Sequence, residues 1–204
     1  FLGFVLMGVG LARPIGDVVE ENVQGSGLDL VIALDLSNSM QVADIENYSR
    51  LQVAKALLQK LAQSLMNDRV GLVVFAGESM VQCPLTLDRG TFMTFLDRVD
   101  PSLMAKQGTD LAGAIETCLD RFDFSASQSR AIVLVSDGED PDPKRLEKAI
   151  KEASRKGVPV FAVGIGSVQG GLIPIGRNAW GEPQYRVYQG RRVVSKLDDR
   201  NLKQ

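Results

Sequence analysis

The stretch Leu28–Met40, which reads LDLVIALDLSNSM, indicates the fold of the chain around it. Its first seven residues, Leu28–Leu34, are almost continuously apolar, as in a strand that a parallel sheet buries on both faces. The run ends at Asp35, and Ser37 and Ser39 follow at alternate positions. Open parallel sheets bind ligands beside the carboxyl ends of their strands. The stretch therefore predicts a buried strand that delivers three oxygen-bearing side chains to one edge of a sheet.

The alternation of strand and helix continues on the carboxyl side of this stretch. Apolar runs predict further strands at Val70–Ala76, Ala131–Val135 and Val158–Val163, with Met80–Cys83 as an antiparallel edge. Helical periods and caps predict helices at Ser49–Met66 and Asp88–Val99, and others that begin near Asp110, Pro143 and Ser195. The pattern predicts one α/β domain with a doubly wound, mostly parallel sheet and helices on both faces. We expect a loop over Gly164–Gly181 and a hairpin over Val187–Val194.

The composition excludes several kinds of chemistry. The 204 residues include no histidine, which removes Ser-His-Asp and Cys-His catalysis and zinc hydrolysis through His ligands. A net charge of -2 argues against nucleic-acid binding, and no P-loop pattern is present. Cys83 and Cys118 have no zinc-type spacing and are expected to be buried thiols, although a disulfide stays open for an oxidising compartment.

Two later loops extend the set of oxygen ligands. Thr109 precedes a predicted helix, and Asp137 directly follows a predicted buried strand. Together with Asp35, Ser37 and Ser39 they offer two carboxylates and three hydroxyls, a set that suits Mg²⁺ or Mn²⁺ and does not suit zinc. Such a set leaves one coordination position open, where the ion can accept a carboxylate from a partner protein.

These residues resemble the metal-ion-dependent adhesion site of von Willebrand factor type A domains. The resemblance lies in the Asp-x-Ser-x-Ser loop, the later Thr and the later Asp-Gly, in that order along the chain. It implies that the metal ligands are Asp35, Ser37, Ser39, Thr109 and Asp137. It also implies a protein-binding module and no enzyme.

The chain is more specifically similar to the bacterial aerotolerance (Bat) group of these domains. The matching segments are Ala12–Pro14, Asp44 with Ser49–Lys55, Asp68–Leu72, Phe75–Gly77, Pro84–Asp88, Gly108–Asp110, Ser136–Asp140 and Gly171–Pro174. The resemblance implies an inner-membrane protein that works with other von Willebrand factor type A proteins and a MoxR-type AAA+ ATPase in stress or aerotolerance.

The amino-terminal residues predict a membrane anchor. Residues 1–13 open with twelve apolar or glycine positions, which we interpret as the carboxyl half of a transmembrane helix, followed by a linker over 14–27 and the domain over 28–204. Between Arg13 and Ser49 there is no further Lys or Arg. By the positive-inside bias, this flank favours a periplasmic domain.

Other interpretations compete with the metal site. Asp35, Ser37 and Ser39 could only satisfy backbone groups of a turn, and Asp110 could cap a helix or hold a metal-bound water. A phosphatase or phosphoacceptor would use Asp35 after the first strand, but the Ser pair and Thr109 then have no role. No general base accompanies the cluster.

Overall fold

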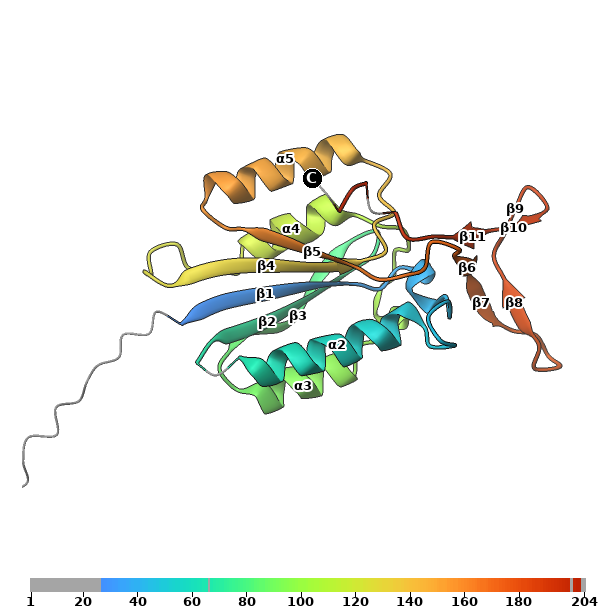
Figure 1. The fold of residues 1–204 in the computed structure, drawn as a ribbon, viewed down its shortest axis with the longest axis horizontal. Helices are drawn as coiled ribbons and strands as arrows, with labels where there is room; N and C mark the ends of the chain where they lie inside the picture. The colour runs from blue at the N-terminus through green and yellow to red at the C-terminus, as the bar shows by residue number, and fades with distance from the viewer. Residues whose placement is uncertain (1–26, 66, 199, 203–204) are drawn as a thin grey trace, which may run out of the picture.

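The computed structural model describes residues 27–65, 67–198 and 200–202, built around a five-stranded sheet (Figure 1). Its strand order is β3-β2-β1-β4-β5. The strands are β1 (Leu28–Asp35), β2 (Arg69–Phe75), β3 (Ser79–Thr86), β4 (Ser129–Ser136) and β5 (Val160–Gly164). All neighbours pair in parallel except β3, which runs antiparallel along one edge. The predicted doubly wound, mostly parallel sheet with an antiparallel edge is thus confirmed.

Helices cover both faces of the sheet (Figure 1). α2 (Arg50–Ser64) and α3 (Arg89–Asp97) lie on one face, and α4 (Leu111–Leu119) and α5 (Pro143–Arg155) lie on the other. Two short 3-10 helices, η1 (Asn38–Gln41) and η2 (Pro101–Leu103), lie in the loops. Alternate residues of β1 enter different cores: Ile32 and Leu34 pack toward α2 and α3, whereas Val31 and Ala33 pack toward α4 and α5. This two-sided burial explains the unbroken apolar run.

Each long helix begins at a polar cap that the sequence carries. The Ser49 side chain accepts from the backbone N–H of Gln52, and the Gln52 side chain accepts from the backbone N–H of Ser49. The two bonds form a capping box. Asp88, Asp110 and Asp142 cap α3, α4 and α5 through their side chains. Three of these caps, Ser49, Asp110 and Asp142, lie where loops from the carboxyl edge of the parallel strands enter their helices.

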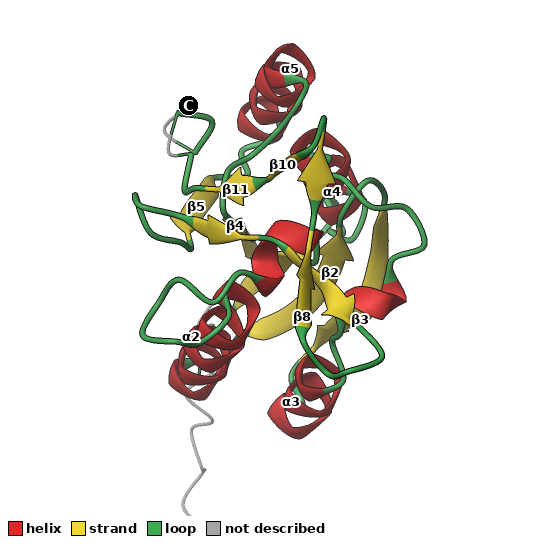
Figure 2. Ribbon diagram, turned by 90° about the vertical axis from the view of Figure 1, so that its right-hand side faces the viewer, coloured by secondary structure: helices red, strands yellow, loops and turns green. Residues whose placement is uncertain are grey.

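Residues Ser167–Lys196 form a projection that we call the arm (Figure 1). Its base pairs β6 (Gly171–Leu172) with β11 (Val194–Ser195). Two hairpins extend from this base, β7 (Pro174–Arg177) with β8 (Pro183–Tyr185) and β9 (Val187–Tyr188) with β10 (Arg191–Arg192). Figure 2 looks onto the arm, which lies beyond the carboxyl ends of the sheet strands.

Three of the predictions made from the sequence concern the arm. The hairpin around Gln189-Gly190 is confirmed, and both residues have positive φ, as a tight turn between short strands requires. The loop expected over Gly164–Gly181 is wrong in part, because β6 and β7 form there by pairing with later segments. The helix expected from Ser195 is wrong over the described residues, because Ser195 pairs in β11.

The two cysteines lie on opposite faces of the sheet. Cys83 belongs to the core beneath α2 and α3, and Cys118 belongs to the core beneath α4 and α5. Both are free and buried, as expected, and burial raises the pKa of both thiols. The sheet between them keeps them from pairing.

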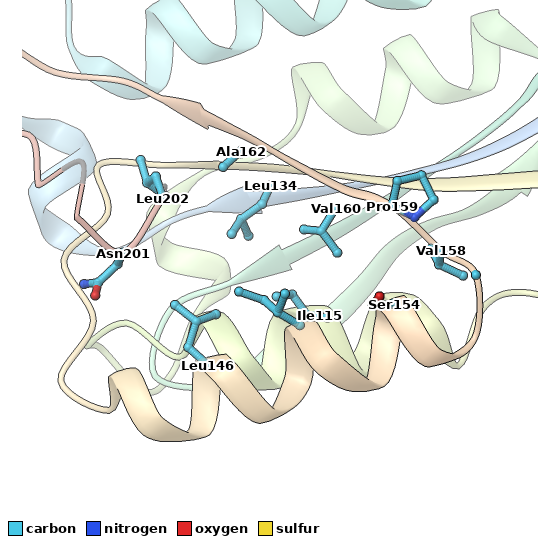
Figure 3. Close-up of a pocket in the computed structure, with 12 residues that line it drawn as sticks. Ile115, Leu134, Leu146, Ser154, Val158, Pro159, Val160, Ala162, Asn201 and Leu202 are labelled. Atoms are coloured by element: carbon cyan, nitrogen blue, oxygen red, sulfur yellow. The ribbon is translucent and has the colours of Figure 1, made fainter. Parts of the chain in front are cut away.

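A cavity of about 330 Å³ opens between α5, α4 and β5 (Figure 3). Most of its lining is aliphatic, and the lining includes Ile115, Leu146, Val160 and Leu202. No carboxylate lines it, so this cavity is separate from the predicted metal site.

The predicted transmembrane segment over residues 1–13 and the linker up to residue 26 lie outside the described residues. Among the helices that are described, none has the length and apolar character needed to cross a bilayer.

Candidate metal centre

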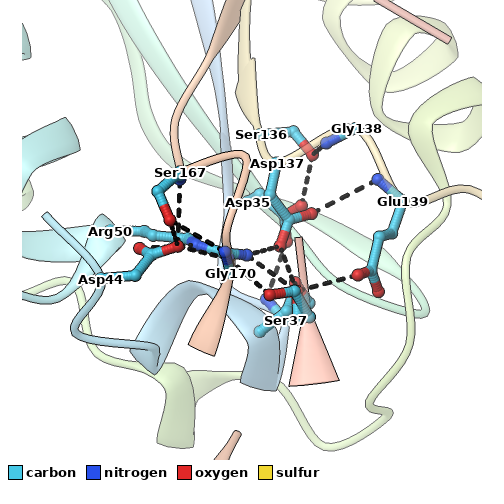
Figure 4. Close-up of polar contacts among 12 residues, drawn as sticks. Asp35, Ser37, Asp44, Arg50, Ser136, Asp137, Gly138, Glu139, Ser167 and Gly170 are labelled. Atoms are coloured by element: carbon cyan, nitrogen blue, oxygen red, sulfur yellow. Dashed lines mark hydrogen bonds and ion pairs between the residues drawn. The ribbon is translucent and has the colours of Figure 1, made fainter. Parts of the chain in front are cut away.

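Two of the predicted ligands come from neighbouring strands. β1 and β4 run in parallel register, so Asp35 at the end of β1 and Asp137 just after β4 reach the same edge of the sheet. The Ser136 hydroxyl joins the strands by donating to Oδ2 of Asp35 over 2.6 Å (Figure 4). Both aspartates are completely buried. The prediction that these two loops converge is therefore met by the geometry.

Asp35 is a buried carboxylate held by hydrogen bonds. Its Oδ1 accepts from the Ser37 N–H at 2.7 Å, and none of the ion pairs in the described part of the chain involves it. Burial, followed by the charge of nearby Asp137, raises the pKa of Asp35 to about 7, although hydrogen bonds from Ser136 and Ser37 act in the opposite direction. A positive charge beside Asp35 would relieve this penalty.

Ser37 and Ser39 turn their hydroxyls toward each other. The two Oγ atoms are 2.9 Å apart, and both residues are buried. Ser37 is the residue before η1, but its side chain makes no capping bond. Buried Met40 anchors η1 in the core beneath. The bond from the Ser37 N–H to Asp35 is the turn contact that the competing interpretation expects of Asp35, whereas the two serine hydroxyls bond each other.

Asp137 is held by a turn that requires glycine. Gly138 has φ +84°, and a Cβ on it would lie 1.9 Å from the carbonyl oxygen of Asp198. Asp198 in turn donates its N–H to the carbonyl of Asp137 at 2.8 Å. The chain after the arm thus packs directly against the loop that carries Asp137 and Glu139, which we call the third ligand loop.

Arg50 is a buried cation that bonds the loop carrying Asp137 to two other segments of the chain (Figure 4). Its Nη1 donates to Oδ2 of Asp137 at 2.8 Å, while its Nε and Nη2 donate to the two carboxylate oxygens of Asp44 at 3.1 and 2.8 Å. Burial alone would lower the pKa of Arg50, but the two carboxylates raise it above its usual value. Arg50 is completely buried, so this is an ion-paired cluster in the interior.

The base of the arm is bonded to the same cluster. Arg50 donates from Nη1 to the Ser195 hydroxyl at 2.8 Å and from Nη2 to the Ser195 carbonyl at 3.0 Å. The Ser195 hydroxyl donates to Oε1 of Glu139 at 2.8 Å, and Ser167 donates both its N–H and its hydroxyl to Asp44 at 3.0 Å. The arm is therefore attached at both its ends to the residues around Asp137.

Thr109 lies at the same edge without a bond to the other candidate ligands. Its loop is placed beside the end of β2, because the N–H of Asp110 donates to the carbonyl of Ala76 at 2.8 Å. The Asp140 carboxylate accepts from the Leu111 N–H at 3.1 Å, which links this loop to the third one. The half-buried Thr109 side chain makes no hydrogen bond to another described residue. Its role as a ligand stays a prediction.

Asp110 is committed to other partners. Its Oδ1 accepts from the Gly113 N–H at 2.8 Å as the cap of α4, and both oxygens accept from Nη1 of Arg145. The geometry favours the capping interpretation over one in which this carboxylate holds a metal-bound water.

The donor set fits a hard divalent cation. It contains two buried carboxylates and two converging hydroxyls, with oxygen as the only donor element, which is the ligand chemistry of Mg²⁺ and Mn²⁺. No group of three or more His, Cys, Asp or Glu side chains with metal-binding geometry occurs within the described residues. A metal ion bound here would therefore need the hydroxyls as ligands.

Arg50 and Ser195 are the participants that sequence reasoning missed. Arg50 follows a helix cap and resembles any exposed charge at a helix start, and its partners Asp137 and Ser195 lie 87 and 145 residues away. The only local signal is Asp44, six residues earlier.

The strand order, with the Asp35–Ser39 loop at the carboxyl edge, defines a class of α/β domain with a known family model. The model for the von Willebrand factor type A domain matches residues 30–139, and the chain belongs to this family.

Two relatives place it further within the family, and a third protein shares its fold. An aerotolerance-related membrane protein from Bacteroides fragilis is 36% identical with a TM-score of 0.79, covering 87% of this chain and 85% of that one. An uncharacterized Borreliella burgdorferi protein is 30% identical over 82% of this chain and 49% of its own length. The chain spans about half the length of the curated relatives it matches. The resemblance to the aerotolerance group is confirmed.

The third is a mussel byssus protein, proximal thread matrix protein 1, whose structure is described with a zinc-occupied MIDAS (metal-ion-dependent adhesion site) motif. It is 20% identical with a TM-score of 0.52 over 69% of this chain and 38% of its own, so it shows the fold alone.

Proposed function

We propose that this domain is a divalent-metal-dependent protein-binding module. Asp35, Ser37, Ser39, Thr109 and Asp137 hold Mg²⁺ or Mn²⁺, and an acidic side chain of a partner protein occupies the remaining coordination position. The observation that carries the proposal is Asp35, a fully buried carboxylate with a raised pKa and no ion pair among the described residues.

The surrounding residues prepare the ligands for that task. Ser136 and the Ser37 N–H hold the Asp35 carboxylate in place, and Arg50 holds one oxygen of Asp137. Because Arg50 already balances part of the acidic charge, a divalent ion between two such carboxylates keeps positive character. When bound, the ion supplies a Lewis-acidic centre that a partner carboxylate can reach.

The family comparisons support this reading. Von Willebrand factor type A domains act in general as interaction modules, and the mussel protein carries zinc in the corresponding motif. The all-oxygen donor set favours Mg²⁺ or Mn²⁺ for this chain, because zinc sites in proteins usually include nitrogen or sulfur ligands.

For the whole protein we propose a bacterial inner-membrane component. Residues 1–13 end a transmembrane helix, residues 14–27 form a linker, and the domain over 28–204 lies in the periplasm. It works in a complex with other proteins of this family and a MoxR-type AAA+ ATPase, in stress or aerotolerance. The similarity to an aerotolerance-related membrane protein supports the membrane association and the role in aerotolerance.

The alternative is a metal-dependent phosphatase or phosphoacceptor that uses Asp35. The hydroxyl groups weigh against it, because the mutually bonded Ser37 and Ser39 and the Thr109 side chain would then have no role.

The test compares the full-length protein with Asp35→Ala in a pull-down from membranes, with MgCl₂ or with EDTA. We expect capture of a partner with wild type in MgCl₂ only, and no capture with Asp35→Ala. Glu147→Gln, which removes an exposed carboxylate on α5, is the control and should behave as wild type. Phosphate-ester turnover by wild type that disappears in Asp35→Ala would instead establish the alternative.

A further inference from the structure

The arm exposes several large apolar side chains to solvent. Trp180, at the tip of the β7–β8 hairpin, is 85% exposed and is the only tryptophan in the chain. Other large apolar residues that the arm exposes are Val168, Ile175, Val187, Tyr188 and Val194. Soluble proteins rarely expose so many apolar groups together unless the surface binds something.

The arm is also basic, whereas the rest of the chain is acidic. Between Ser167 and Lys196 there are five basic residues and one acid, Glu182, which gives a net charge of +4. The whole chain has a net charge of -2, so the other residues together carry -6. The basic residues are therefore concentrated on one projection.

Four exposed cations of the arm form no ion pair with another described residue. Arg186, Arg191, Arg192 and Lys196 are exposed, and none of them takes part in the ion pairs of the described residues. The Arg192 guanidinium lies 5.7 Å from the ring centroid of Tyr185. Arginine beside aromatic rings is the composition that dominates the binding energy of protein interfaces.

The arm and the candidate metal centre adjoin each other. A hollow of about 540 Å³ is lined by Glu139, which follows Asp137, by Val194 and Lys196 of the arm, and by Leu197, Asp198 and Arg200 after the arm. A second hollow, of about 480 Å³, lies between the β9 and β10 residues Tyr188, Arg191 and Arg192. The second hollow is the basic one of the two, and its Arg191 and Arg192 are the groups on the arm that can bind further carboxylates of a partner.

We infer that the arm is a second contact surface for the partner of the metal centre, and that it binds a protein segment rich in Asp and Glu. This inference rests on the proposed function, since it takes the acidic residue at the metal as one of several. Charge complementarity favours an acidic protein segment as the partner. The arginines that form no ion pair with a described residue attract its carboxylates, and the exposed aromatic side chains contact its adjoining apolar groups.

An anionic membrane is the competing occupant, since it also attracts basic and aromatic residues. The arrangement of the chain favours a protein. The described chain enters β1 at the end of the sheet opposite the arm (Figure 1), so the membrane anchor proposed above is attached to the domain at the end away from the arm.

The experiment titrates the full-length protein with poly-L-glutamate in low-salt buffer and follows the part of the tryptophan emission that Trp180→Phe removes, which reports on the arm without labelling. EDTA is present throughout, so that the metal centre makes no contribution. The test variant is Arg191→Glu/Arg192→Glu, and the matched control is Lys144→Glu/Lys148→Glu, which makes the same charge change on the exposed surface of α5.

We expect poly-L-glutamate to shift the Trp180 emission to shorter wavelength in wild type and in the α5 control. The arm variant should bind at least about tenfold more weakly. Absence of a shift in wild type, or equal affinities for the two variants, would overturn the inference. So would tighter, arm-dependent binding to phosphatidylglycerol vesicles than to poly-L-glutamate. Calorimetry with MgCl₂ tests the metal centre separately, so failure of one proposal is distinguishable from failure of the other.

Discussion

The guanidinium of Arg50 donates to the carboxylate of Asp137 across 87 residues of sequence, with Nη1 and Oδ2 2.8 Å apart and neither side chain exposed. One residue of α2 thereby fixes a candidate metal ligand that follows β4. The same guanidinium bonds Asp44 and Ser195, so the first turn of a helix connects the third ligand loop to the base of the arm.

Replacement of Arg50 by methionine should destabilise the fold strongly. The change leaves the carboxylates of Asp44 and Asp137 buried without a cation, and the loss of one partner from a buried ion pair costs about 3–5 kcal/mol. Urea unfolding measures the effect. Lys151→Met, which removes an exposed ion pair on α5, is the control. A loss no larger than that of the control would show that the cluster contributes little.

Stability of the metal-free protein should fall as the pH rises from about 4 to about 7. In this range folded Asp35 retains a proton, because burial and Asp137 raise its pKa to about 7, whereas unfolded Asp35 has lost it. The folded state binds more protons, so rising pH favours unfolding. Urea midpoints at several pH values, with EDTA, measure the slope. Asp35→Asn should flatten it, and an unchanged slope in that variant would assign the effect elsewhere.

Mg²⁺ affinity should increase over the same pH range. Metal binding requires the deprotonated carboxylate, so protons on Asp35 compete with the ion below pH 7. Calorimetric titrations with MgCl₂ at pH 6 and pH 8 provide the comparison. Equal affinities at the two pH values would mean that Asp35 does not bind the ion.

Thr109→Ala should weaken Mg²⁺ binding and leave the fold intact. The Thr109 hydroxyl bonds no other described residue, and α4 behind it is held by its buried apolar side chains. Thr109→Ser keeps the hydroxyl and should retain affinity. Calorimetry and thermal melting separate the two effects. Wild-type affinity in Thr109→Ala would remove this residue from the ligand set.

Gly138→Ala should cost more stability than Gly157→Ala. Both glycines have positive φ, which costs an alanine about 1–2 kcal/mol. A Cβ at Gly157 meets nothing within 4 Å, whereas one at Gly138 meets the Asp198 carbonyl oxygen at 1.9 Å. Urea unfolding of the two variants gives the comparison. Equal losses would indicate that the segment around Asp198 moves away without cost.

Local patterns predicted the sheet and the placement of the two aspartates. The apolar run of β1 and the caps at Ser49, Asp88 and Asp110 depend on residues near in sequence, so they are readable from the chain. Asp35 and Asp137 could be placed together because parallel strands end at one edge.

Non-local pairings were beyond sequence reasoning. β6 forms only because it meets β11, more than twenty residues later, so its glycine-rich sequence indicated a loop. Ser195 looked like a helix start, but its hydroxyl instead bonds Arg50 and Glu139. No pattern within one segment reports such contacts.

The separation of Cys83 and Cys118 by the sheet has a practical consequence. Each thiol is packed in a different core layer, and burial raises the pKa of both, so little of either is present as the reactive thiolate at neutral pH. A cysteine introduced at an exposed arm position such as Gln189 would therefore react with maleimide reagents ahead of both native thiols. The wild-type chain thus already offers a background for attaching a spectroscopic probe to the arm.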